Sequence, residues 1–228
     1  MTQPSAEAMD RVAQDALAMV QDGMRLGLGT GRAAEAFIRA LGVRVAAGMR
    51  VRCVTTSNRS EELAASLAIP LSTIDELPEL DLAFDGTDEF TAELELTKGL
   101  GGALLRERVV ATAARRFIVL ATPEKRVNML GTRAPIPVEV VRFAASPTER
   151  ALRRLGAEPV LRRAVDGGVF LTDNGNVILD ARFSPLREPK TTHAAIREIP
   201  GVVDTGLFLG MAHTVLVGAE PIERLDRP

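Results

Sequence analysis

Short apolar runs alternate with polar or glycine-rich loops and with helical stretches along residues 1–130 of this chain. The runs lie at residues 24–28, 49–55, 80–84 and 116–121. Between them, apolar residues recur at the spacing of an amphipathic helix. Parallel strands need a crossover connection, usually a helix, so this alternation predicts a mostly parallel sheet with helices on both faces. The sequence therefore predicts an α/β fold of the Rossmann-like class.

A different pattern begins near residue 132. It comprises an extended run, a helix, a hairpin-like segment and a second helix, at residues 135–141, 146–155, 170–183 and 190–199. This order predicts a small α+β, ferredoxin-like domain inserted at residues 132–206. We expect the apolar run at residues 213–217 to rejoin the first sheet, so the main α/β domain would comprise residues 1–131 and 207–228.

Composition limits the kind of partner. The chain has 228 residues, 46% hydrophobic and 25% charged, which is enough to bury a full core. A formal net charge of −2 argues against a nucleic-acid or anionic-membrane partner. Cys53 is the single cysteine, which excludes an internal disulfide, and no apolar run reaches the ~18 residues of a membrane span. With no leader-like segment at its start, the chain is expected in the cytoplasm, acting on a small molecule.

The first motif with chemical potential is GLGTGR at residues 27–32, which leaves a predicted strand and enters a helix. Backbone N–H groups at such a turn favour an anion. A dinucleotide site is one alternative, but the third glycine comes one residue early and no acidic residue closes the strand at 51–55. Tight strand–helix packing without a ligand is another. Arg32 favours a phosphomonoester, because a guanidinium at the helix start adds charge-assisted donors.

The second motif is DGTDE at residues 85–89, which follows a buried strand. Open α/β sheets usually place ligands at the carboxyl ends of their strands. The carboxylates of Asp85 and Asp88 suit sugar hydroxyls, and they also suit a divalent metal, since hard cations need no histidine. An acidic turn that only caps a helix remains the alternative.

The third motif is KGLGG at residues 98–102, followed by a helix that carries Glu107. Lys98 can neutralise a developing oxyanion and Glu107 can act as a general base, which together suit proton abstraction beside a carbonyl. The alternative for Glu107 is an exposed helix position. Lys125 ends the next strand and is expected to face the same ligand, with a surface lysine as its alternative.

Six blocks occur together in an order that resembles the type A ribose-5-phosphate isomerase family. They are GLGTG at 27–31, DGTDE at 85–89, KGLGGA at 98–103 with RE at 106–107, PIPVEV at 135–140, TDNGN at 172–176 and IPGVV at 199–203. The resemblance implies an aldose–ketose isomerase without metal or cofactor, a homodimer or homotetramer. The implied reaction interconverts D-ribose 5-phosphate and D-ribulose 5-phosphate through an enediol(ate) in the non-oxidative pentose phosphate pathway.

The resemblance also implies roles for individual residues. Glu107 matches the general base, Asp85 and Lys98 match residues at the reacting oxygens, and Asp88 matches a sugar-binding carboxylate. The implied substrate-binding residues are Thr30, Gly31, Arg32, Ala33, Asp85, Gly86, Thr87, Asp88, Lys98, Gly99, Leu100, Gly101 and Lys125.

This chain departs from the family pattern around the phosphate. Arg32 and Ala33 follow Gly31 where the family usually has Ser-Thr, and Met9 stands near the position of a first-helix lysine. Our hypothesis is that Arg32 replaces the missing lysine and hydroxyls as a phosphate ligand. Leu100 in a normally all-glycine triplet is a milder departure.

Two other classes of protein share related architectures. A sugar-phosphate sensor of a transcription regulator would carry a DNA-binding helix-turn-helix, for which we expect no room before the first helix. A sugar-phosphate lactonase or deaminase would need a catalytic histidine near the ligand. His193 and His213 are far along the chain from the three motifs.

Overall fold

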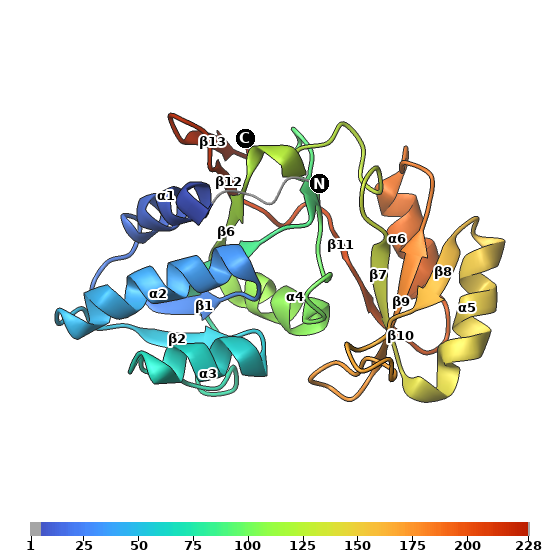
Figure 1. The fold of residues 1–228 in the computed structure, drawn as a ribbon, viewed down its shortest axis with the longest axis horizontal. Helices are drawn as coiled ribbons and strands as arrows, with labels where there is room; N and C mark the ends of the chain where they lie inside the picture. The colour runs from blue at the N-terminus through green and yellow to red at the C-terminus, as the bar shows by residue number, and fades with distance from the viewer. Residues whose placement is uncertain (1–5, 228) are drawn as a thin grey trace. The chain divides into compact units, whose positions relative to one another are not determined.

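The computed structural model describes residues 6–227, which pack as two compact units (Figure 1). Unit 1 comprises the residues up to Thr87, Arg106–Arg126 and the residues from Met211 onward. Unit 2 comprises Asp88–Leu105 and Val127–Gly210. That residues 132–206 form a separate domain stays a prediction.

Unit 1 is built on a six-stranded sheet with the order β13-β12-β6-β3-β1-β2. All neighbours are parallel except the edge strand β13, which is antiparallel to β12. This confirms the predicted mostly parallel sheet, including the return of the chain near residue 214; β13 was not predicted. The strands are β1 (Arg25–Leu28), β2 (Arg52–Thr55), β3 (Leu80–Gly86), β6 (Ala114–Ala121), β12 (Thr214–Val217) and β13 (Glu223–Asp226).

Helices cover both faces of this sheet, as predicted. They are α1 (Ala6–Leu17), α2 (Arg32–Ala46), α3 (Asn58–Ser66) and α4 (Leu104–Ala113), with a short 3₁₀ turn η1 (Pro123–Lys125) after β6. Leu26 and Leu28 of β1 point to the face that carries α1 and α2, because they belong to one buried cluster with both helices. Gly27, between them, points to the other face, where a Cβ would lie 2.4 Å from Cγ1 of Val110 in α4.

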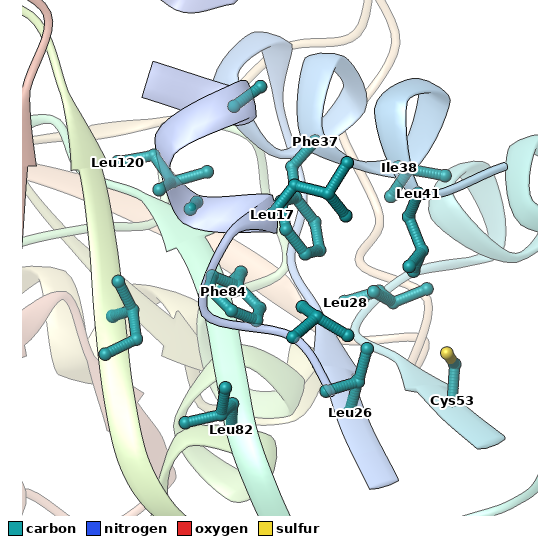
Figure 2. Packing of buried hydrophobic residues seen from close by; sticks show 14 of the residues in the cluster. Leu17, Leu26, Leu28, Phe37, Ile38, Leu41, Cys53, Leu82, Phe84 and Leu120 are labelled. Atoms are coloured by element: carbon teal, nitrogen blue, oxygen red, sulfur yellow. The ribbon is translucent and has the colours of Figure 1, made fainter. Parts of the chain in front are cut away.

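Figure 2 shows the core on the α1–α2 face. The ring of Phe37 in α2 stacks on Phe84 of β3, with centroids 4.1 Å apart. Leu17 of α1 belongs to the same cluster. Cys53 of β2 is fully buried at its margin, and burial raises the pKa of its thiol to about 12. This thiol is therefore a packing group that stays protonated.

Unit 2 contains a four-stranded antiparallel sheet with the order β10-β7-β9-β8 and a three-stranded sheet with the order β11-β5-β4. The four-stranded sheet is the predicted small α+β element, whereas the strands of the three-stranded sheet lie outside residues 132–206. The strands are β4 (Glu89–Phe90), β5 (Leu96–Thr97), β7 (Ile136–Val140), β8 (Glu158–Leu161), β9 (Val177–Arg182), β10 (Val202–Thr205) and β11 (Leu207–Phe208). The helices are α5 (Ala145–Arg154) and α6 (Pro189–Arg197), with a 3₁₀ turn η2 (Arg142–Ala144).

The predicted hairpin at residues 170–183 is wrong. Strand β9 pairs with β8 instead, and residues 170–176 form a loop before it. The reason is a buried carboxylate: Glu139 Oε1 accepts hydrogen bonds from the side chains of Thr172 (3.0 Å), Asn174 (3.1 Å) and Asn176 (2.9 Å). Three polar side chains of this loop thus converge on one carboxylate oxygen.

Within residues 6–227, no helix combines the length and the apolar character that crossing a bilayer requires.

Candidate active site

Asp85 lies at the carboxyl end of β3 and is 3% exposed. Its Oδ1 accepts hydrogen bonds from the backbone N–H groups of Thr30 (3.1 Å) and Gly86 (2.7 Å). The pairing of Leu28 with Phe84 between β1 and β3 brings the GLGTG turn alongside this carboxylate. The sheet register thus joins the first two motifs of the sequence.

The hydroxyl of Thr30 joins a cluster that the sequence did not indicate. Its Oγ1 lies 2.7 Å from Oγ1 of Thr56 and donates to Oγ of Ser57 at 2.8 Å. Ser60 donates from its hydroxyl to the Gly29 carbonyl at 2.6 Å, and its N–H donates to Ser57, the N-cap of α3. The one signal in the sequence is the polar run TTSN at residues 55–58, where the second strand ends. Parallel pairing of β1 and β2 places this run next to the end of β1.

Helix α2 begins beside Thr30. Gly31 is its N-cap with φ +101°, a conformation that favours glycine, and Arg32 is the first helical residue. The Arg32 side chain is exposed and forms no hydrogen bond or ion pair within residues 6–227. A 15-residue helix that starts next to hydroxyl groups and an unengaged guanidinium is suited to bind an anion.

Glu107 lies in the first turn of α4 and is 4% exposed. Val110, one turn further along the same helix face, packs over Gly27. Because α4 returns the chain from the end of β3 to the start of its parallel neighbour β6, it runs antiparallel to both strands. Glu107 is therefore about 4.5 Å nearer than Val110 to the carboxyl edge of the sheet. Asp85, about 6.6 Å beyond Ala83 on the same face, lies at that edge too.

Lys125 ends the 3₁₀ turn after β6 and is partly buried. Its Nζ donates to the backbone carbonyl of Thr87, two residues beyond Asp85. The structure thus places this lysine at the same edge of the unit 1 sheet, rather than on an isolated surface.

The remaining candidate residues belong to unit 2. Lys98 is 2% exposed; its backbone N–H donates to the Gly206 carbonyl at 2.8 Å, and its Nζ lies 5.7 Å from the centroid of the Phe208 ring. The Asp88 carboxylate accepts from the Leu100 N–H at 3.0 Å. Gly99 has φ +101°, so the loop depends on glycine at this point.

Each unit therefore holds its own part of the candidate set. In unit 1 the structure brings together Thr30, Gly31, Arg32, Ala33, Asp85, Gly86, Thr87, Glu107 and Lys125. In unit 2 it brings together Asp88, Lys98, Gly99, Leu100 and Gly101.

The structure offers little evidence for a catalytic histidine or for a metal centre among the described residues. His213 precedes β12, at the amino edge of the unit 1 sheet, opposite to the edge of Asp85, and its Nδ1 accepts from the Phe117 N–H at 3.1 Å. His193 Nδ1 contacts the hydroxyl of Thr205 at 2.8 Å in unit 2. In the part of the chain that the structure describes, no three His, Cys, Asp or Glu side chains gather as a metal-binding group.

Residues 52–221 match the family model of ribose 5-phosphate isomerase A (phosphoriboisomerase A). A ribose-5-phosphate isomerase A from Roseiflexus castenholzii is 50% identical over 221 residues, which are 96% of this chain and 94% of that protein. The chain belongs to the ribose 5-phosphate isomerase A family. A second member, from Gloeobacter violaceus, is 49% identical over 209 residues, 91% of this chain and 90% of its own.

Solved structures of ribose 5-phosphate isomerases have the same fold. The enzyme from Methanocaldococcus jannaschii superposes with a TM-score of 0.92 at 40% identity, covering 96% of this chain and 98% of its own. A D-ribose-5-phosphate isomerase in complex with phospho-erythronic acid gives a TM-score of 0.95 at 34% identity, covering 99% of this chain and all of its own.

Proposed function

We propose that this chain is an aldose–ketose isomerase that interconverts D-ribose 5-phosphate and D-ribulose 5-phosphate, a step of the non-oxidative pentose phosphate pathway. The observation that carries the proposal is the placement of two buried carboxylates, Asp85 and Glu107, at one edge of the unit 1 sheet in a member of this family. The N-terminus of α2 lies beside Asp85 and suits the phosphate.

Glu107 is proposed as the general base. Its carboxylate removes the proton from C2 of the open-chain aldose, and the electrons move to O1 to form an enediolate. The same group then returns the proton to C1, while the proton on O2 moves to O1, so that the ketone forms at C2. A carboxylate held out of bulk water keeps the abstracted proton for return.

Lys98 and Asp85 are proposed to act on the oxygens. The Lys98 ammonium stabilises the negative charge that develops in the enediolate, in place of a metal or another cofactor. Asp85 assists the transfer of the proton between O2 and O1. Two backbone N–H groups hold its Oδ1 at the carboxyl end of β3, which fixes the position of the carboxylate.

The other candidate residues are proposed to bind the rest of the substrate. Thr30, Gly31, Arg32 and Ala33 would hold the phosphate, and Asp88 would accept hydrogen bonds from sugar hydroxyls. Further contacts are proposed from Gly86, Thr87, Gly99, Leu100, Gly101 and Lys125. A solved relative that contains phospho-erythronic acid supports a phosphorylated sugar-like ligand for that protein.

Assembly and location belong to the same proposal. We expect a homodimer or homotetramer in the cytoplasm, with no nucleic-acid or membrane partner. The nearly neutral formal charge of −2 supports a small-molecule substrate rather than a polyanion.

One assay tests the function. The purified protein is incubated with ribose 5-phosphate, with and without EDTA, and ketose formation is followed. Ketose formation that is unchanged by EDTA is the expected result. No turnover of ribose 5-phosphate would contradict the proposed reaction, and activity that EDTA abolishes would favour a metal bound by Asp85 or Asp88.

A further inference from the structure

Arg162 is not among the predicted site residues, but it contacts the lysine–glycine loop at residues 98–102. It directly follows β8, and its guanidinium forms a two-pronged pair with Asp180 of β9, at 2.9 Å from Nε and 2.5 Å from Nη2. The two side chains are only 12% and 22% exposed. Its third nitrogen, Nη1, donates to the backbone carbonyls of Gly99 (2.9 Å) and Leu100 (3.1 Å). One guanidinium therefore joins the antiparallel sheet of unit 2 to two consecutive peptide groups of the loop.

These contacts set the orientation of the peptide groups on both sides of Leu100. In a trans peptide the N–H points opposite to the C=O. The N–H that opposes the Gly99 carbonyl is that of Leu100, and it donates to Asp88. The N–H that opposes the Leu100 carbonyl is that of Gly101, so it points away from Arg162. Within residues 6–227 this N–H has no acceptor, and Gly101 is exposed.

The loop has little means of holding this shape by itself. Gly99 and Gly102 adopt φ of +101° and +85°, and glycine restricts its backbone less than any other residue. Phe170 supports the far end, because its ring occupies the space where a Gly102 Cβ would lie, 2.4 Å from Cζ. The same ring packs 5.7 Å from the Arg162 guanidinium, and the Phe170 N–H donates to the Arg162 carbonyl at 3.1 Å. Arg162 thus contacts both the loop and Phe170, the residue that packs against the far end of the loop.

We propose that Arg162, held by Asp180, is a positioning residue for the isomerase reaction. It aims the Gly101 N–H at an oxygen of the sugar phosphate that becomes negative in the enediolate, and it fixes the backbone that carries Lys98. A guanidinium on the Leu100 carbonyl also polarises that peptide group, which makes the Gly101 N–H a stronger donor. The inference rests on the proposed function, since it needs an enediolate to stabilise.

The test compares Arg162→Ala with Arg163→Ala, a change at the neighbouring exposed arginine. Steady-state kinetics with ribose 5-phosphate and a thermal melt are measured for each variant and for the wild type. Arg162→Ala is expected to lower kcat by about 10- to 100-fold with a smaller change in KM. The reason is that a misplaced N–H donor stabilises the charge of the transition state less, while it affects substrate binding less strongly. Millimolar guanidinium is expected to restore part of kcat in Arg162→Ala. Arg163→Ala is expected to match the wild type.

The outcomes separate this inference from the proposed function. A wild type that does not isomerise ribose 5-phosphate overturns the function, whatever the variants do. An active wild type together with a folded Arg162→Ala of unchanged kcat overturns the positioning role, as does a loss of melting temperature alone. If Arg162→Ala does not fold, Arg162→Lys decides: its single ammonium cannot span Asp180 and both carbonyls, so a several-fold lower kcat supports the inference and an unchanged kcat overturns it.

Discussion

Position 29 has room for no side chain beside Asp85. A Cβ on Gly29 would lie 2.2 Å from Cγ and 2.3 Å from Oδ1 of Asp85. The backbone can approach the carboxylate this closely only because Gly29 lacks a Cβ, and the approach brings the Thr30 N–H within 3.1 Å of Oδ1. Glycine at position 29 is therefore required for the Asp85 carboxylate to keep this position.

The first prediction is that Gly29→Ala lowers kcat for ribose 5-phosphate by about 100-fold, because the methyl group displaces Asp85 by an ångström or more. The control is Gly48→Ala. Gly48 has φ +101° and open space around its Cβ position, so this change strains the backbone away from the site. It is expected to cost about 1 kcal/mol of unfolding free energy and to leave kcat unchanged. Equal kcat values in the two variants would show that Gly29 is not needed to position the Asp85 carboxylate.

The second prediction concerns the phosphate. Arg32→Ala is expected to raise KM for ribose 5-phosphate about tenfold or more, since a charged hydrogen bond contributes ~1.5–3 kcal/mol. Arg39→Ala, at an exposed position two turns along the same helix, is the matched control and should leave KM unchanged. An Arg32→Ala enzyme with the KM of the wild type would assign the phosphate to other donors, such as the backbone N–H groups at the start of α2.

The third prediction is a pH dependence of stability at the amino edge of the same sheet. Asp81 accepts hydrogen bonds from the Arg25 guanidinium (3.1 Å) and from the Arg25 backbone N–H (2.8 Å), and these bonds, the first above all, hold the pKa of Asp81 below its ordinary value. A lowered folded pKa means that the contribution is present above the ordinary Asp pKa of about 3.9 and is lost as the pH falls through the folded value.

Urea unfolding of the wild type and of Asp81→Asn checks this dependence. At pH 6 the variant is expected to be less stable by no more than about 1 kcal/mol, because the pair is partly exposed. The difference should shrink as the pH is lowered towards 3. A difference that stays constant from pH 6 to pH 3 would show that protonation of Asp81 is not its cause.

Much of the unit 1 part of the site could be predicted because its residues lie at the ends of local patterns. Asp85 ends an apolar run, and Thr30 precedes an amphipathic helix, so strand–helix alternation alone places both at the carboxyl edge of a parallel sheet. Glu107 could be placed on the helix that follows the glycine-rich turn, but its burial could not be predicted, since an exposed helix position was the alternative. Their chemical roles came from the resemblance to a family and stay proposals for this chain.

The contacts that the sequence did not indicate join residues far apart in the chain. Thr56 reaches Thr30 across 26 positions, and Arg162 reaches Gly99 across 63. Arg162 binds backbone carbonyls. Every residue has a backbone carbonyl, so no residue type in the sequence marks this contact. The predicted hairpin failed for a related reason, since the side chains of Thr172, Asn174 and Asn176 bind the buried Glu139 of another strand.

The role of Glu107 is tested most directly by the kinetics of Glu107→Gln with ribose 5-phosphate. The amide keeps the shape of the side chain but cannot take up a proton, so kcat is expected to fall by 10²- to 10⁴-fold, about the usual contribution of a general base, with KM within a few-fold of the wild type. A melting temperature equal to that of the wild type would show that the variant is folded. A folded Glu107→Gln enzyme with the wild-type kcat would contradict the account.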